Sequence, residues 1–128
     1  MKMNYTTLSQ LHHALEEISN NKMPFKLSMI IAKNLNMLKK EDEFYIEQER
    51  RFALEYLVID AEKGVFEQSA PNVFRIKEGK EEECRKARED LDAFEFDVAL
   101  HMIPVALIET MEFTPNQLSA LEVILEEE

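Results

Sequence analysis

The most regular pattern of apolar positions in this chain runs from about residue 24 to about residue 57. Ile31, Leu38, Tyr45 and Phe52 recur at seven-residue intervals, and a second row lies beside them, made of Ile30, Met37 and Phe44. The spacing predicts a single helix that is ~50 Å long at 1.5 Å per residue. A two-stranded coiled coil would need apolar residues where Asn34, Glu41 and Gln48 stand. We therefore expect the stripe to pack mainly on other parts of the same chain.

Three shorter helices are predicted around this long one. The first spans about residues 7–20, with Thr7 and Gln10 as a capping box and one apolar face made of Leu8, Leu11, Leu15 and Ile18. Another spans about residues 80–93 and is strongly charged, with a narrow apolar face made of Cys84, Ala87, Leu91 and then Phe94. We expect this helix to lie on the surface and to cover one stripe of the long helix.

The last predicted helix has the clearest beginning in the chain. Thr114 is expected to be its N-cap, Pro115 its first residue and Gln117 the partner that completes a capping box. A hydrophobic staple joins Phe113 and Leu118, and the expected buried face is made of Leu118, Leu121 and Leu125. The three glutamates 126–128 form an acidic end that opposes the helix dipole, so we expect this end to fray.

The strands are predicted from β-forming residues and from alternation. Two short strands are expected near residues 57–60 and 73–77, joined by a mobile loop, and a longer one over residues 94–102, where apolar and polar positions alternate as far as Pro104. Residues 105–111 fit either a short strand or a helical turn. The predicted fold class is α+β and predominantly helical: a long central helix packed with shorter helices and a small antiparallel sheet. Residues 1–128 are expected to form a single domain.

Composition narrows the function classes. The net charge is -11, yet residues 1–40 carry six lysines against two glutamates, so the acidity lies in residues 41–128. An acidic protein repels phosphate backbones, which disfavours nucleic-acid binding. The excess charge serves solubility, or else an acidic face that meets a basic partner. One cysteine rules out an internal disulfide and fits a reducing compartment. We expect no secretory signal, and the longest apolar run, residues 98–108, is too short to span a bilayer.

The residues that could support chemistry form no recognisable motif. His12 and His13 stand four residues before Glu16 and Glu17, so either pair could hold a metal, but two ligands do not make a site. We expect a solvated helix face there. His101 is expected on the polar side of the predicted strand, in a structural or exposed role.

Other reactive or ligand-binding groups also have simple structural explanations. Cys84 as a nucleophile would need a base and a lowered pKa, and its place on an apolar face favours a packed residue. The glutamates 81–83 suit a helix N-terminus. Four methionines, at positions 29, 37, 102 and 111, are expected in the core. With no phosphate-binding glycine loop, no Cys/His signature and no nucleophile elbow, we predict no catalytic, cofactor-binding or metal-binding residues and a protein that is not an enzyme.

Two segments resemble a family of small proteins encoded by tailed phages and prophages of Gram-positive bacteria. The first is the start of the long helix, residues 23–28 (MPFKLS) followed by residues 31–35 (IAKNL), and the second is the closing run 113–122 (FTPNQLSALE) with its acidic end. The order of elements is similar too, although residues 58–77 are more apolar than that family's usual insert. The family has no assigned function, so the resemblance implies no catalytic residues.

The expected function is a protein–protein interaction module of phage origin, either a virion or assembly accessory or an adaptor that acts on a host protein. The long helix and the acidic part would form the contact surface, and a homo-oligomer is a further expectation. The alternative is an acidic inhibitor or regulator of host defence or nucleic-acid machinery. In either case we expect a protein partner, no nucleic acid, no membrane, no cofactor, and a location in the host bacterial cytoplasm or in the virion.

Overall fold

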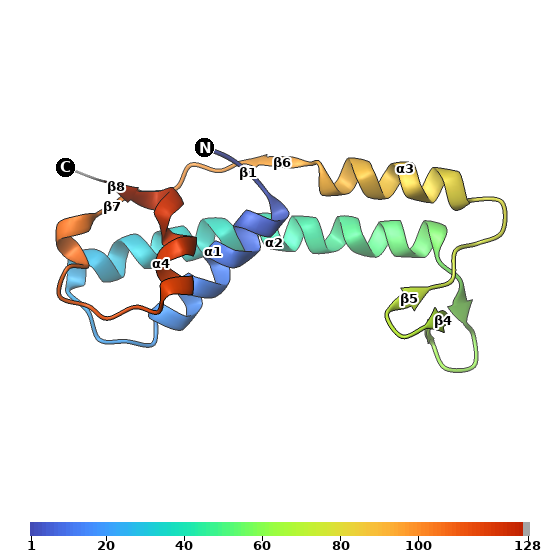
Figure 1. Cartoon of the computed structure of the whole chain (residues 1–128), viewed down its shortest axis with the longest axis horizontal. Helices are drawn as coiled ribbons and strands as arrows, with labels where there is room; N and C mark the ends of the chain where they lie inside the picture. The colour runs from blue at the N-terminus through green and yellow to red at the C-terminus, as the bar shows by residue number, and fades with distance from the viewer. Residues whose placement is uncertain (127–128) are drawn as a thin grey trace. The chain divides into compact units, whose positions relative to one another are not determined.

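The computed structural model describes residues 1–126, and within this range the chain is mostly helical (Figure 1). The four α-helices are α1 (Tyr5–Ile18), α2 (Phe25–Tyr56), α3 (Glu81–Asp92) and α4 (Pro115–Leu121). One short 3₁₀ turn, Val105–Leu107, precedes α4, and another, Glu122–Ile124, follows it. The strands form four separate two-stranded pairs. An α+β, predominantly helical fold with a long helix packed on shorter ones was predicted, and it is confirmed.

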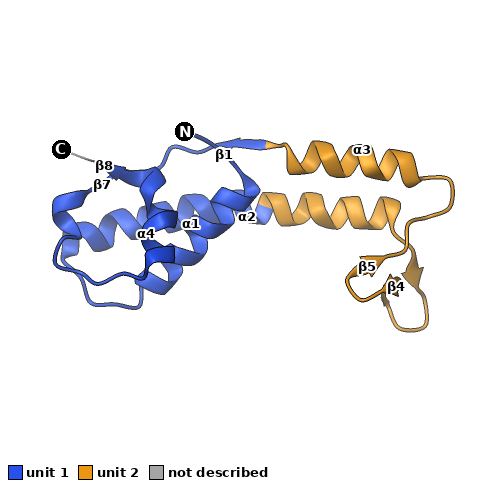
Figure 2. Ribbon diagram, viewed as in Figure 1, with its two compact units in different colours: residues 1–43, 95–128 blue, residues 44–94 orange. Residues whose placement is uncertain are grey.

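The chain divides into two compact units (Figure 2). Unit 1 consists of residues 1–43 and 95–128, and unit 2 consists of residues 44–94. Helix α2 contributes its first nineteen residues, 25–43, to unit 1 and its last thirteen, 44–56, to unit 2. The two units are described separately below.

Helix α1 begins two residues earlier than its sequence pattern indicates. Its N-cap is Asn4, whose side-chain oxygen accepts a hydrogen bond from the Thr7 backbone N–H at 2.9 Å. Thr7 is therefore inside the helix and the predicted Thr7–Gln10 capping box is wrong, because asparagine caps as well as threonine does. The predicted apolar face is confirmed, since Leu8, Leu11 and Leu15 are all fully buried.

Unit 1 contains the main core. Its part of α2 buries Leu27, Ile31 and Leu38, and the fully enclosed side chains of α1, Ile103, Leu121 and Ile124 complete the cluster. The bounds of α2 agree with the predicted helix to within a residue, and the packing of its stripe within the chain is confirmed here. Of the methionines predicted in the core, Met29 and Met102 are about 40% exposed, so that prediction is wrong for these two.

The small sheets of unit 1 differ from the predicted strand. Only Glu95–Asp97 of the predicted 94–102 strand is extended in a ladder, as β6, which pairs antiparallel with β1 (Lys2–Asn4). Phe96 and Val98 are buried as the alternation requires, and the Val98 N–H donates to the Met1 carbonyl at 2.9 Å, whereas residues 99–102 lack a ladder partner among the described residues. The alternation of apolar and polar residues correctly identified the buried face but overestimated the length of the strand. That length depends on how many residues of a partner strand are available for pairing.

The final helix starts where predicted and ends earlier. Both hydrogen bonds of the Thr114–Gln117 capping box are present, at 3.0 and 3.2 Å. The helix stops at Leu121, and Leu125–Glu126 forms β8, which pairs in parallel with β7 (Ile103–Pro104). Leu121 is buried as expected, but Leu118 is 41% exposed, so its predicted burial is wrong. Glu126 belongs to a strand rather than to a frayed helix end, and residues 127–128 lie outside the described residues.

Unit 2 pairs the end of α2 with α3 and adds two hairpins. Ring contacts between Phe44 and Phe94 and a cation–π contact between Lys80 and Tyr56 show that the two helices run antiparallel. The predicted mobile loop between residues 60 and 73 is wrong: strands β2 (Ile59–Asp60) and β3 (Val65–Phe66) pair with each other, as do β4 (Gln68–Ala70) and β5 (Val73–Phe74). Gly64, at a φ of 68°, turns between β2 and β3, a backbone conformation that glycine adopts readily.

Candidate interaction surface

The two histidine–glutamate pairs of α1 are local contacts on one helix. His12 Nε2 lies 3.0 Å from Glu16 Oε1, and His13 Nε2 lies 2.7 Å from Glu17 Oε1. Asp42 reaches His12 only at 4.0 Å. Within residues 1–126 no group of three or more His, Cys, Asp or Glu side chains could hold a metal ion. The pairs are what a helical spacing of four residues produces.

His101 acts through its backbone, on a partner that the sequence pattern did not identify. Asn34 Nδ2 donates to the His101 carbonyl at 2.9 Å, and the His101 N–H donates to Asn34 Oδ1 at 2.8 Å. Asn34 is completely buried. In the sequence it looks like an interruption of the apolar stripe, whereas in unit 1 it fixes the 98–102 segment against α2. Only the polarity of a residue in the middle of that stripe could have indicated this role.

Cys84 is buried in unit 2, as its place on the apolar face of α3 predicts. Burial raises the pKa of its thiol, and the nearby Arg88 only partly opposes this shift. Residues 44–94 contain no histidine that could serve as its base. A raised pKa keeps the thiol protonated and weakly nucleophilic at neutral pH.

Three of the six acidic side chains of α3, those of Glu82, Glu89 and Asp92, form ion pairs along the same helix. Arg85 contacts Glu82 and also Glu89, at 2.6 Å from Glu89 Oε1. The Arg85 guanidinium holds the pKa of Glu82 below its ordinary value. Such exposed pairs three and four residues apart are screened by water and favour the helix only weakly. They also neutralise part of the acidic surface that the sequence suggested.

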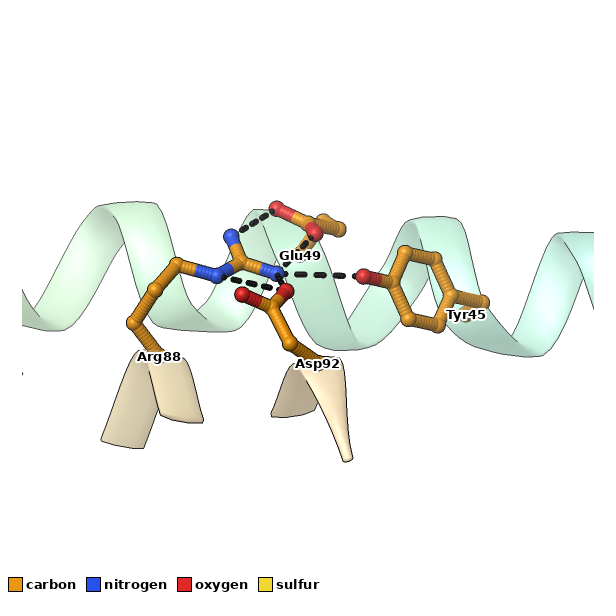
Figure 3. A network of polar contacts seen from close by, with 4 residues as sticks. All are labelled: Tyr45, Glu49, Arg88 and Asp92. Carbon is orange, nitrogen blue, oxygen red and sulfur yellow. Dashed lines mark hydrogen bonds and ion pairs between the residues drawn. The ribbon is translucent and has the colours of Figure 1, made fainter. Parts of the chain in front are cut away.

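One polar network joins α3 to α2 within unit 2 (Figure 3). The Arg88 guanidinium donates to Glu49 at 2.6 and 3.0 Å, to Asp92 at 2.7 and 3.0 Å, and to the Tyr45 hydroxyl at 3.1 Å. Arg88 holds the pKa of Glu49 below its ordinary value, while burial and the Glu49 carboxylate raise that of Tyr45 to about 12. The guanidinium also lies 5.0 Å from the centre of the Phe52 ring. The network therefore fixes the register of the two helices.

Unit 2 buries very little of its apolar surface. Its only buried side chains are Tyr45 and Cys84, whereas most of the described core belongs to unit 1. Eight large apolar side chains of unit 2 are instead exposed, by 42–56%: Phe44, Ile46, Leu54, Ile59, Val65, Val73, Phe74 and Phe94. Small folded units are marginal in stability because they bury a small fraction of their surface. Because unit 2 has 51 residues and only two buried side chains, much of its apolar surface remains available for contacts with other molecules.

Six of these exposed side chains lie in two regions, and Ile46 and Leu54 lie outside both. One is the strand segment, residues 57–77, which carries Ile59, Val65, Val73 and Phe74. The other is a concave surface of about 490 Å³ between α2 and α3, which we call the aromatic face. Its apolar lining consists of Phe44, Phe52, Tyr56, Ala87, Leu91 and Phe94, and its charged rim consists of Arg51, Glu55 and Asp90.

A second recess of about 540 Å³ lies where the strand segment meets the helices of unit 2. Phe52, Leu57, Phe66, Phe74, Ile76 and Cys84 form its apolar lining, with Arg85, Arg88 and two glutamates at its edges. Both arginines are engaged in ion pairs. The recess therefore offers apolar volume without an uncommitted cation that would select a charged ligand.

None of the helices within residues 1–126 qualifies as a membrane span; α2 has the length for one but carries charged side chains along it. Comparison with protein-family models, with characterised proteins and with solved structures found no match to this chain in any of the three.

Proposed function

We propose that this chain is a non-enzymatic protein–protein interaction module of phage origin, a virion or assembly accessory or an adaptor that acts on a host protein. The observation that supports it is the division between the two units: unit 1 contains nearly all of the described core, whereas unit 2 exposes eight large apolar side chains in 51 residues, against six in the longer unit 1. Exposed apolar clusters on soluble proteins commonly mark interaction sites. The phage origin rests on the resemblance of residues 23–35 and 113–122 alone.

The strand segment is the surface that we assign to the partner. Its side chains Ile59, Val65, Val73 and Phe74 are 44–56% exposed, and its strands are two or three residues long, so they contribute little core of their own. The outer part of the segment is ordered by its two short ladders, by the Arg75–Glu67 ion pair and by a ring contact between Phe66 and Phe74, with centroids 6.4 Å apart. Aromatic residues such as Phe74 are enriched at protein interfaces, whose buried centres are more apolar than the rest of the surface.

Site-specific photo-crosslinking tests this proposal. A photoreactive phenylalanine analogue is placed at Phe74, and in a second protein at Glu83, an exposed position on α3. Both proteins are expressed in the cell that carries the gene and are then irradiated. The proposal predicts one discrete heavier species with the probe at Phe74 and none with the probe at Glu83. The absence of a species from Phe74, or the same species from both positions, would refute the assignment.

The competing proposal is an acidic inhibitor that mimics nucleic acid. Its support is the net charge of -11. Against it, several acids of unit 2 already pair with arginines of the same unit, including Glu49, Glu89 and Asp92. The two proposals differ in salt dependence, since a contact through exposed charges weakens steeply as salt screens them, whereas an apolar contact does not. Repeating the crosslinking in lysates of the same cells at low and high salt distinguishes them.

A further inference from the structure

We propose that the aromatic face binds the same face of a second copy of this chain, forming a symmetric dimer. This inference uses a different surface from the strand segment, so it stands or fails independently of the function proposed above. It rests on the apolar content of the face, on the charges around it and on its size.

The aromatic face retains exposed rings after the chain has folded. Phe44 and Phe94 contact each other, with ring centroids 6.3 Å apart, yet they remain 49% and 44% exposed. Phe52 and Tyr56 line the same concave surface and contact each other at 5.2 Å. Aromatic side chains provide large contact areas, and they are enriched in the centres of interfaces. The face thus has the apolar centre that a docking surface needs.

The charged rim indicates what occupies the face. Arg51 stands on it together with Glu55 and Asp90, and all three are exposed; Arg51 also contacts Glu47 at 3.3 Å, an exposed pair that a partner carboxylate can share or replace. The two carboxylates would repel a strongly acidic partner, and the arginine would repel a strongly basic one. A second copy related by a twofold axis brings both signs, so that Arg51 of each chain can approach a carboxylate of the other. Twofold symmetric dimers are the commonest soluble assemblies, and their interfaces must be self-complementary in this way.

The size of the face sets the expected affinity. The two helical segments are each ~20 Å long and together ~20 Å wide, so the flat footprint is ~400 Å² per chain and ~800 Å² for two. Stable complexes usually bury ~1,200–2,000 Å² of accessible surface, which exceeds the flat footprint because side chains are rough. The footprint of the face is therefore below that range, in the size class of weak and transient contacts. We expect a reversible dimer with a dissociation constant in the micromolar range, not a permanent one.

Sedimentation equilibrium of the full chain tests the inference with two matched pairs of variants. Phe44→Ser removes an anchor from the aromatic face, while Ile46→Ser changes an equally exposed side chain on the same helix that does not line it. Arg51→Glu makes the rim wholly acidic, while Arg50→Glu makes the same charge change one residue away and off the face. Circular dichroism confirms that each variant is folded.

The wild-type chain should move from the 15.0 kDa monomer toward about twice that mass as its concentration rises through the micromolar range. Phe44→Ser and Arg51→Glu should each weaken association at least ~10-fold, the effect typical of an interface anchor. Ile46→Ser and Arg50→Glu should leave association unchanged. A monomer at all concentrations would overturn the inference, and so would equal effects within either pair.

Discussion

The buried contact between Asn34 and the backbone of His101 supports a quantitative prediction. Asn34→Leu keeps the volume of the side chain but removes two hydrogen bonds, of 2.8 and 2.9 Å, and leaves the N–H and C=O of His101 without that partner. A buried polar group that loses its partner costs about 1–3 kcal/mol. Because residue His101 is itself exposed, water can partly replace the lost bonds, so we take the lower half of that range for each. The expected loss for the two groups together is about 2–4 kcal/mol.

Urea denaturation followed by circular dichroism measures this loss. With a slope of about 2 kcal/mol per molar urea, the unfolding midpoint should fall by about 1–2 M. The matched control is Asn36→Leu, because Asn36 lies on the same helix two residues later and is exposed. We expect that control to shift the midpoint by less than about a quarter of that amount. Equal shifts for the two variants would refute the role assigned to Asn34.

A second substitution at the same position adds a pH signature. Asn34→Asp keeps an acceptor for the His101 N–H, but the ionised carboxylate faces the His101 carbonyl in a fully buried site. Burial should raise the folded-state pKa of the introduced carboxyl above its ordinary value of about 3.9. The neutral acid can donate as the amide does. This variant should therefore approach wild-type stability at low pH and lose stability as pH rises from about 4 through the raised pKa. A pH-independent deficit would contradict this reasoning.

Three further substitutions should have distinct effects. Leu38→Asp places an unpaired charge where no solvent reaches and should reduce the free energy of unfolding by several kcal/mol, which melting curves would show. Thr114→Ala removes a formed cap and should cost about 1 kcal/mol in urea denaturation; no change would mean that the cap adds nothing. Glu49 has a lowered pKa in the folded state, so its stabilising effect is present at neutral pH and is lost as pH falls below its ordinary value. Glu49→Gln should therefore flatten the acid limb of stability against pH, and an unchanged limb would contradict the pairing with Arg88.

Much of the helical architecture could be predicted from the sequence, because it depends on local signals. The seven-residue spacing of Ile31, Leu38 and Tyr45 identified α2 nearly to the residue, and all three are buried. The Thr114 cap located the start of α4, because capping involves residues only three apart. These features need no information about distant parts of the chain.

The features that could not be predicted depend on residues that are distant in the sequence, or on which apolar side chains remain exposed after folding. Strand β1 is three residues long and pairs with residues 95–97, a contact that no local pattern specifies. Asn34 looked like a flaw in the stripe until its partner, His101, was visible. Phe44 continues a row whose earlier members, Ile30 and Met37, are half-buried, and Phe94 continues the face of α3 on which Cys84 is buried. Periodicity does not distinguish a covered face from an exposed one. The candidate surfaces became apparent only from the exposure of individual side chains.

The central claim is that unit 1 supplies the core while unit 2 provides surfaces for contact, one of them for a second copy. Hydrogen exchange of the full chain, measured at about 2 µM and about 200 µM, tests it most directly, since exchange reports local opening segment by segment. We predict that amides of α1 exchange slowly and equally at both concentrations, and that amides of α3 exchange faster and become protected at the higher one. Protection of α3 that equals that of α1 and does not change with concentration would contradict the claim.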